Sequence, residues 1–326
     1  MKVEEVQKLL HAILIQGKIT EKKIGKIAID TRTMKKGDVF LCMIGKRLDG
    51  HQFIEEAIKL GASVIVVSKM VSFETEIPIL LVDNTNEAYF TFARYHKEKI
   101  EPSVIAITGS VGKTTTKELI AKFLKEKYCV LKSEGNFNNH IGVPMTMLKL
   151  KPKHEVLILE VGMNHAGEIA RLSELAKPNT AVITNIGTSH IGYLKTKKNI
   201  LKAKMEITEG MEHGTLVLNG NDPYLKKVTS CRKYDVIPVR SDCFHAQIKK
   251  EKEYFGLVLR HQKQVYRIKL PYCAFHLLDN IFLALQVGLL YHVSMSDMLQ
   301  VLEHTSFQLQ GRLEHIPFGI NQTLIN

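Results

Sequence analysis

The sequence has no tryptophan, and aromatic residues make up only 7% of its 326 positions. A platform of aromatic side chains for stacking nucleic-acid bases is therefore not indicated. The five cysteines are scattered and form no C-x-x-C pair, which argues against a zinc knuckle and a disulfide framework. No run of about 18 consecutive apolar residues occurs, so we expect no membrane-spanning helix.

The charge balance is one-sided, with a formal net charge of +12 and no long block of like charges. Such an excess suits nucleic acid, an anionic membrane surface or a phosphorylated substrate, and it also suits the solvated lysines of a basic proteome. Acidic residues early in "MKVEEVQKLLHAILIQGK" predict an amphipathic helix and not a signal peptide. We therefore expect a cytoplasmic protein.

Short apolar runs alternate with helical spacing through the first hundred residues. The runs "KIAID", "DVFLCMI", "SVIVV" and "PILLVD" predict strands, and residues 51–62 and 86–99 predict helices. The charged segment "KEKIEPS" contains a proline and precedes a new strand. It predicts a domain boundary near residue 100.

After the boundary, strands and helices alternate regularly. The runs "SVIAIT", "EVLILEV", "TAVITNI" and "TLVLN" each have a continuous apolar centre and are separated by amphipathic helices, which predicts a buried parallel sheet. The alternating runs "AQIKK", "YFGLVLR" and "QVYRIKL" predict antiparallel strands, and two further helices follow. The expected fold class is α/β: a small N-terminal α/β domain (1–100), a central domain with a mostly parallel sheet flanked by helices (101–315), and a short extended segment (316–326).

The stretch "IAITGSVGKTTTKELI" follows one of these strands and opens a helix. It resembles a phosphate-binding loop, but only two residues separate Gly109 from Gly112, and position 107 is Ile107 where the longer pattern needs glycine. The two glycines would let backbone N–H groups approach an anion, Lys113 adds a charge, and Thr114 or Thr115 offers a hydroxyl for Mg²⁺. The alternative is an ordinary turn between a strand and a helix.

Further candidate residues follow the next strands. Glu160 ends an apolar strand, where a carboxylate could hold Mg²⁺ or cap the next helix. Glu168 is a first-turn acid or a substrate contact, and His190 is a structural histidine or a ligand at a third strand end. By spacing alone Lys204 is a solvated helix lysine.

The loop "EGNFNNHIGVP" gathers Asn136, Asn138, Asn139 and Gly142. Asparagine side chains can hydrogen-bond a polar substrate, and they can equally close local Asx turns. Both interpretations stay open on the residues alone.

Several segments together resemble the ATP-dependent Mur ligases of peptidoglycan synthesis: "TGSVGKTTTKE", "EGNFNNHIGVPMTML", "LEVGMNHAGEIARL", "AVITNIGTSHIGYL" and "AKMEI". The stretch "IDTRTMKKGDVFLCMIGKRLDGHQFIEEAIKLGASVIVV" resembles that family's uridine-nucleotide-sugar domain, so the likeness covers nearly the whole chain. It implies a UDP-sugar-binding domain over 1–100, an ATP-binding domain over 101–315 and, at 316–326, the start of the family's C-terminal domain.

The resemblance also assigns roles to individual residues. It implies an ATP site formed by Gly109, Ser110, Gly112, Lys113, Thr114, Thr115, Asn280 and Arg312. It implies magnesium ligands at Thr114, Glu160, His190 and a carbamylated Lys204, with catalytic roles for Lys113, Glu160, His190 and Lys204. It implies contacts to the UDP-sugar peptide at Thr31, Arg32, Asp49, Gly50, His51, Asn136 and Asn139. One departure is "YCAFHLLDN", which keeps His276 and Asn280 but lacks the family's glycine and first asparagine.

The implied reaction joins D-Ala-D-Ala to UDP-MurNAc-tripeptide through an acyl phosphate, with ATP and Mg²⁺. We expect a monomer that binds no nucleic acid and does not insert into a membrane. The chain ends about where the family's third domain would begin, so we expect substrate binding without normal turnover. Three alternatives remain: a related ligase for another amino acid, a silent nucleotide-binding or regulatory homologue, and, on net charge alone, a nucleic-acid-binding protein.

Overall fold

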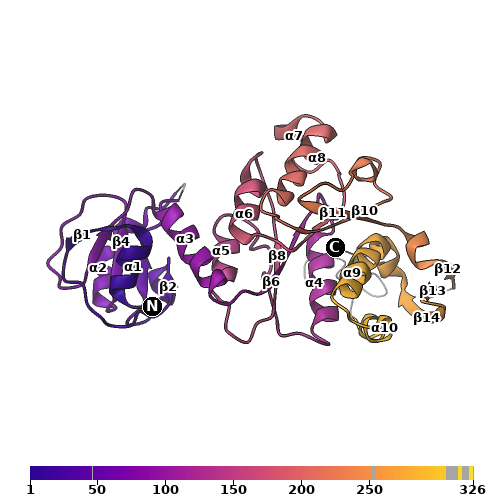
Figure 1. Cartoon of the computed structure of the whole chain (residues 1–326), viewed down its shortest axis with the longest axis horizontal. Coiled ribbons are helices and arrows are strands. Elements are labelled where there is room, and N and C mark those ends of the chain that lie inside the picture. The colour runs from indigo at the N-terminus through magenta and orange to yellow at the C-terminus, as the bar shows by residue number, and fades with distance from the viewer. Residues whose placement is uncertain (46, 252–253, 306–314, 318–322, 326) are drawn as a thin grey trace. The chain divides into compact units, whose positions relative to one another are not determined.

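The computed structural model describes residues 1–45, 47–251, 254–305, 315–317 and 323–325. The chain divides after Lys99 into two compact units, Met1–Lys99 and Ile100–Asn326. Figure 1 colours the first unit indigo to purple and the second from magenta to yellow.

The first unit is built on a five-stranded sheet in the order β1-β5-β4-β3-β2, with only β1 antiparallel to its neighbour. The strands are β1 (Ile13–Gln16), β2 (Ile27–Ala28), β3 (Val39–Leu41), β4 (Val64–Val67) and β5 (Ile79–Leu81). The helical segments are α1 (Val3–Leu10), η1 (Thr31–Thr33), η2 (Gly50–Phe53), α2 (Ile54–Lys59) and α3 (Thr85–Glu98).

The expected N-terminal helix is only half right. Helix α1 ends at Leu10, His11 adopts a left-handed conformation, and residues 13–16 form the edge strand β1. Pairing with β5 satisfies the backbone of this segment and adds an edge strand to the sheet. A long-range contact has therefore overridden the local helical spacing.

The second unit contains a six-stranded sheet in the order β11-β10-β9-β6-β8-β7, and every neighbouring pair is parallel. The strands are β6 (Ser103–Thr108), β7 (Val130–Lys132), β8 (Val156–Glu160), β9 (Thr180–Ile183), β10 (Gly214–Asn219) and β11 (Tyr234–Val239). The predicted α/β class is confirmed. The short or half-exposed strands β7 and β11 were not predicted, because neither shows a continuous apolar run.

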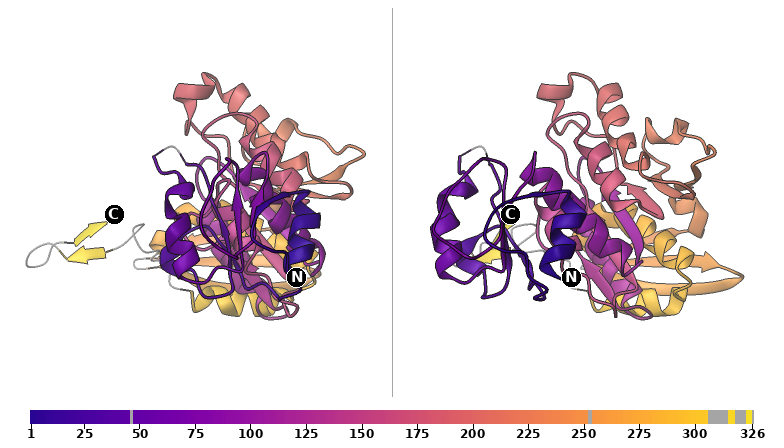
Figure 2. Two further views of the ribbon diagram at one scale, coloured as in Figure 1. Left: turned by 90° about the vertical axis from the view of Figure 1, so that its left-hand side faces the viewer. Right: turned by 60° about the vertical axis from the view of Figure 1, so that its left-hand side comes forward.

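Helices cover both faces of this sheet (Figure 1, Figure 2). On one face lie α4 (Lys113–Leu124) and α9 (Leu278–Leu290), with α10 (Met295–Glu303) packed on α4. On the other lie α5 (Gly142–Met147) and α6 (Glu168–Ala176), and α6 also packs on η3 (Glu206–Thr208). The chain between β9 and η3 forms α7 (Ile191–Leu194) and α8 (Lys197–Met205).

Helix α9 belongs to the core of the second unit. Residues 272–290 are long and apolar enough to cross a membrane by length and composition, but Ile281, Phe282 and Leu285 are at most 2% exposed. They pack with α4 and the strands in one continuous apolar cluster. Burial in this core accounts for the helix's apolar character.

A three-stranded antiparallel sheet extends the same core, as the alternating pattern predicted. It consists of β12 (Gln247–Lys250), β13 (Tyr254–His261) and β14 (Gln264–Pro271). Short 3-10 segments connect the elements: η4 (Leu225–Lys227), η5 (Ser241–Phe244) and η6 (Tyr272–Leu277). Near the C-terminus β15 (His315–Pro317) pairs with β16 (Thr323–Ile325), and most of the predicted 316–326 segment lies outside the described residues.

Gly210 allows η3 to approach α6 closely. Its N–H donates to Ser173 Oγ, and a Cβ added there would lie 2.0 Å from the Ser173 carbonyl oxygen. We expect Gly210→Ala to lower the free energy of unfolding by about 3 kcal/mol, since two backbones would have to separate. Urea unfolding is the measurement. Gly256→Ala is the control, because its nearest neighbour would be 3.8 Å away, and equal effects of both variants would contradict this packing.

Candidate active site

The glycine loop lies between β6 and α4, at the carboxyl edge of the parallel sheet. Gly112 has a φ of 80°, which disfavours other residues, and a Cβ there would lie 2.2 Å from Asn280 Nδ2. A Cβ on Gly109 would lie 1.8 Å from Thr184 Oγ1. Ile107 lies inside β6, so the shorter spacing reflects a strand that continues to Thr108 before the loop begins.

The loop is held from inside the unit. The backbone N–H groups of Ser110 and Val111 donate to Asn185 Oδ1 at 3.1 and 3.0 Å, and Thr184 Oγ1 donates to the Val111 carbonyl. Lys113 Nζ donates to the Gly109 carbonyl at 2.9 Å. The first-turn N–H groups of α4 have no partners within the helix, so this end of α4 favours an anion.

Glu160, the last residue of β8, is 2% exposed. Its Oε2 accepts a hydrogen bond from Thr114 Oγ1 at 2.9 Å, and its Oε1 accepts one from Asn138 Nδ2 at 3.0 Å. Lys117 Nζ lies 3.5 Å from Oε2. The carboxylate therefore faces the glycine-loop helix and does not cap the helix that follows it.

A cavity of about 230 Å³ opens beside these groups. It brings together residues from the glycine loop, the asparagine loop and the ends of β8 and α8. The lining residues are Gly109, Lys113, Asn138, Asn139, Gly162, Met163, Asn164, Glu168, His190 and Lys204. Polar groups predicted from five separate segments thus meet in one space.

The structure places Lys204 differently from the prediction made on helical spacing. Spacing indicated a solvated helix lysine, but the residue is 2% exposed and lines this cavity. Burial, with a smaller contribution from the charge of Lys113, lowers the pKa of Lys204 to about 7. The amine is therefore substantially neutral near physiological pH and can act as a nucleophile or be modified.

His190 and Glu168 also line the cavity. Burial lowers the pKa of His190, and the nearby charges of Lys204 and Lys113 lower it further, which favours the neutral imidazole. Glu168 starts α6 and accepts a hydrogen bond from the Asn164 N–H at 2.6 Å. It is therefore both a first-turn acid and a wall of the cavity.

The asparagine loop makes local turns and faces the cavity. Asn139 Oδ1 accepts from the backbone N–H groups of Ile141 and Gly142, while Asn138 and Asn139 line the cavity. Asn136 is exposed, and its carbonyl accepts the Asn138 N–H. The local turns are therefore present, and contact of this loop with a substrate stays a prediction.

The remaining ATP candidates differ in placement. Asn280, on α9, donates to Thr116 Oγ1 at 2.9 Å and so contacts the glycine-loop helix. Ser110 Oγ accepts the Gly187 N–H at 2.8 Å, and Thr115 is 8% exposed within α4. Arg312 lies outside the described residues.

The first unit holds its own candidates. His51 donates through Nδ1 to Asp49, since its Nε2 accepts the Ser68 N–H at 3.0 Å. The hydrogen bond from Lys69 to Asp49, joined by those from His51, holds the pKa of Asp49 below its usual range. Both His51 nitrogens are thus occupied within the unit, and the ring connects η2 to Ser68, the residue that follows β4.

Thr31 and Arg32 lie together in η1. Thr31 Oγ1 donates to Glu56 at 2.7 Å, whereas the Arg32 guanidinium binds Asp30 and is 85% exposed. Arg32 is therefore the accessible cation of this segment.

The oxygen atoms around Glu160 suit a magnesium ion. Thr114 Oγ1 and Glu160 Oε2 are 2.9 Å apart, and Mg²⁺ prefers oxygen ligands. Within the described residues, no three His, Cys, Asp or Glu side chains are placed to hold a metal. The site fits an ion that takes most ligands from phosphate and water. The His190–Lys204 pair fits a second ion only if Lys204 has become a carbamate.

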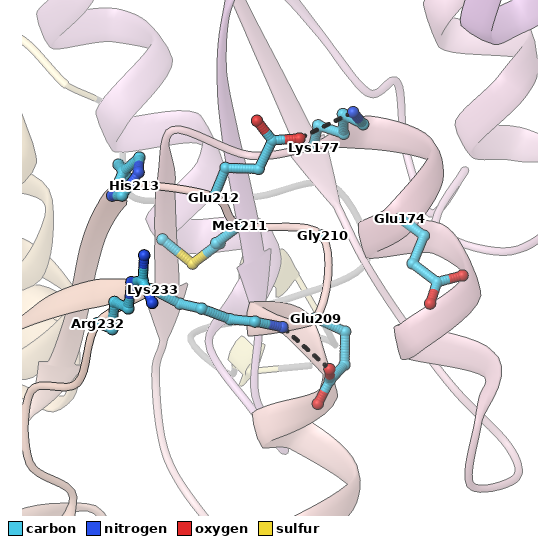
Figure 3. Close-up of a pocket in the computed structure, with 9 residues that line it drawn as sticks. All are labelled: Glu174, Lys177, Glu209, Gly210, Met211, Glu212, His213, Arg232 and Lys233. Atoms are coloured by element: carbon cyan, nitrogen blue, oxygen red, sulfur yellow. Dashed lines mark hydrogen bonds and ion pairs between the residues drawn. The ribbon is translucent and has the colours of Figure 1, made fainter.

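A larger hollow of about 590 Å³ lies away from these residues. Its lining residues 209–213 and 232–233 immediately precede β10 and β11, so it lies at the amino edge of the sheet. Figure 3 shows Lys177 paired with Glu212 and Lys233 with Glu209 across it. In open α/β sheets ligands bind at the carboxyl edge, so the smaller cavity is the candidate site.

Comparison with known proteins shows the family of this chain. The Mur ligase middle domain matches residues 107–288, and the Mur ligase family catalytic domain matches residues 23–97. This chain belongs to the Mur ligase family. A Haemophilus influenzae UDP-N-acetylmuramoyl-tripeptide–D-alanyl-D-alanine ligase is 31% identical over 99% of this Mur ligase chain and 71% of its own length.

A further relative and two solved structures align over between half and three quarters of their own length. A Bacillus subtilis protein of the same name is 38% identical over 71% of this chain, and the chain spans about half of that relative, 51%. The crystal structure of MurF from Acinetobacter baumannii has a TM-score of 0.89 at 29% identity, covering 99% of this chain and 72% of that one. MurF from Thermotoga maritima, solved with ADP, has a TM-score of 0.79 at 27% identity, covering 90% and 69%.

Three residues at the site of this Mur ligase chain were not predicted from the sequence. Asn185 holds the glycine loop, and Asp222 accepts the Ile186 N–H at 2.8 Å and so holds the strand end beside it. Lys117 contacts Glu160. One signal was available: Lys117 stands three residues before the buried Ile120, on the apolar stripe of α4, where a lysine is out of place.

The buried Lys204 makes stability depend on pH. The lysine keeps its proton to about pH 10 in the unfolded chain but loses it near pH 7 in the folded chain. Between these values the unfolded chain binds more protons, so the free energy of unfolding falls as the pH is lowered. We expect Lys204→Met to raise the free energy of unfolding by a few kcal/mol at about pH 6, with the gain vanishing toward about pH 10. Urea unfolding without carbonate or Mg²⁺ measures this. The exposed Lys202→Met is the control, and a gain independent of pH would contradict the assignment.

Proposed function

We propose that this chain forms the substrate-binding and ATP-binding part of an amide-bond ligase. The ligase adds D-Ala-D-Ala to UDP-MurNAc-tripeptide in the cytoplasm, for peptidoglycan synthesis. One arrangement carries the proposal: Lys113, His190 and Lys204 line one cavity beside the glycine loop, and Glu160 accepts a hydrogen bond from Thr114, the residue after Lys113. The names of the aligned relatives support the choice of substrates.

The second unit would bind ATP at the amino end of α4. The helix end attracts the negative charge of the phosphates, and Lys113 adds a cation within the same turn. Asn280 lies against Gly112 and is the candidate contact for the adenine. ADP in the Thermotoga maritima structure supports a nucleotide site in this fold.

Thr114 and Glu160 would hold one magnesium ion, and His190 with a carbamylated Lys204 would hold another. Bound magnesium would neutralise charge as two anions approach each other. The lowered pKa of Lys204 supports carbamylation, because only the neutral amine attacks CO₂; the product loses one proton to become the carbamate. That change replaces a cation with a carboxylate-like ligand.

Amide formation would take two steps. A carboxylate oxygen of the tripeptide attacks the γ-phosphorus of ATP, which forms an acyl phosphate and releases ADP. The amine nitrogen of D-Ala-D-Ala then attacks the acyl carbon, loses a proton and expels phosphate. Lys113 would offset the negative charge that both steps bring together, and Asn138 and Asn139 would face the peptide end.

The first unit would bind the uridine nucleotide sugar. The exposed Arg32 and the loop ordered by Asp49 and His51 are the candidate contacts, with Thr31 and Gly50 shaping the backbone. The retained lysines and Glu160 disfavour a silent nucleotide-binding homologue, since buried charges without a function would be costly to keep.

A turnover assay tests the proposal. We expect ATP-dependent phosphate release with UDP-MurNAc-tripeptide and D-Ala-D-Ala from this chain, extended through any downstream coding sequence. Omitting either substrate is the control. A folded, extended protein that releases no phosphate would exclude the ligase assignment.

Lys113 supplies the second test. We expect Lys113→Ala to abolish measurable ATP binding. The hydrogen bond from a charged donor to a phosphate contributes about 3 kcal/mol, and the variant also loses the longer-range attraction between the lysine charge and the phosphates. Isothermal titration of ATP·Mg²⁺ into residues 1–326 is the measurement. Lys125→Ala, at the far end of α4, is the matched control. Unchanged affinity in Lys113→Ala would show that the loop does not bind phosphate.

A further inference from the structure

Lys117 is a cation without access to solvent. Its side chain is 0% exposed, although a buried ammonium group is costly unless it is paired and hydrogen-bonded. Its Nζ donates to the Gly135 carbonyl at 2.9 Å and lies 3.5 Å from carboxylate oxygens of both Glu118 and Glu160. These partners offset the burial cost.

The partners come from separate segments of the site. Glu160 ends β8 and carries the candidate metal-binding oxygen, while Gly135 opens the asparagine loop. Glu118 in turn forms an ion pair with Lys132 on β7. One ammonium group therefore links the glycine-loop helix, the metal-facing carboxylate and the loop that faces the cavity.

The asparagine loop and Glu160 are joined a second time by Asn138 Nδ2, which donates to Glu160 Oε1. The Glu160 N–H also donates to Ser133 Oγ at 3.2 Å, just before the loop. Loop and carboxylate thus share one hydrogen-bond network with Lys117 at its buried end. A change in the position of either would be transmitted to the other.

We propose that Lys117 is a positioning residue that holds Glu160 and the asparagine loop in one arrangement, so that the metal-nucleotide side and the peptide side of the cavity are ordered together. The proposal rests on the proposed function for the identity of the ligands. Lys117 is buried and is not among the residues that line the cavity, so it acts through its partners.

A fluorescent reporter tests the anchoring of the loop. The chain has no tryptophan, and Phe137 in the loop is 39% exposed, so Phe137→Trp gives a single tryptophan, whose emission is excited apart from that of the tyrosines. We expect acrylamide quenching of this reporter to increase about twofold when Lys117→Met is added, since the loop loses its buried attachment. Lys122→Met on the same helix removes the same charge elsewhere and should leave quenching unchanged.

Nucleotide binding tests the positioning of Glu160. ADP affinity is measured by titration with Mg²⁺ and with EDTA, in proteins that keep Phe137. We expect Lys117→Met to leave the affinity in EDTA unchanged and to reduce the gain from Mg²⁺ by about tenfold, the usual effect of losing a partner of a metal ligand. A residue that only stabilises the fold would leave this ratio unchanged, and Lys122→Met should do so.

Lys117→Gln is the second variant. A buried amide without an ion pair costs less free energy than a buried charge without one, so this variant keeps a polar group at the position at a smaller cost. Wild-type quenching together with a wild-type Mg²⁺ gain in either folded variant would overturn the proposal. If the unchanged chain itself shows no gain from Mg²⁺, the proposed metal site fails. The quenching comparison then still decides whether Lys117 anchors the loop.

Discussion

The buried carboxylate of Glu160 is the interaction around which the crevice is organised. A charge that is 2% exposed needs several partners, and here a threonine, a lysine and an asparagine supply them. Two of these partners come from the glycine-loop helix and one from the asparagine loop. Since β6 and β8 are parallel neighbours, both of their ends lie at one edge, where a single carboxylate can reach all three.

The close approach of neighbouring segments to the backbone at three glycines is the second constraint on the carboxyl edge of the sheet. Side chains fill the space where Gly109, Gly112 and Gly162 would carry a Cβ: Thr184, Asn280 and Asn138 respectively. The glycines therefore let β9, α9 and the asparagine loop contact the strand ends directly. The short spacing of the glycine loop belongs to this crowded geometry, in which Asn185 already supplies an oxygen to two loop N–H groups.

Positive charge gathers in the same small space. Lys113 and Lys204 line one cavity, and the proximity of Lys113 helps burial to lower the pKa of Lys204. Such a cavity favours phosphate and carboxylate ligands, the two kinds of anion that meet in the proposed reaction. It also provides a lysine that can be neutral, which an exposed lysine on the same helix cannot offer.

The sequence by itself determined the parallel sheet, the glycine loop and the placement of Glu160 and His190 after strands, because these follow from local periodicity and from the order of elements. The burial of Lys204 and Lys117, the hold of Asn185 on the loop, and the pairing of residues 13–16 with β5 were decided only by the tertiary structure. Each depends on residues distant in sequence that fill the space around a side chain. Helical spacing alone does not contain that information, since it describes one face of a helix and not what packs against it.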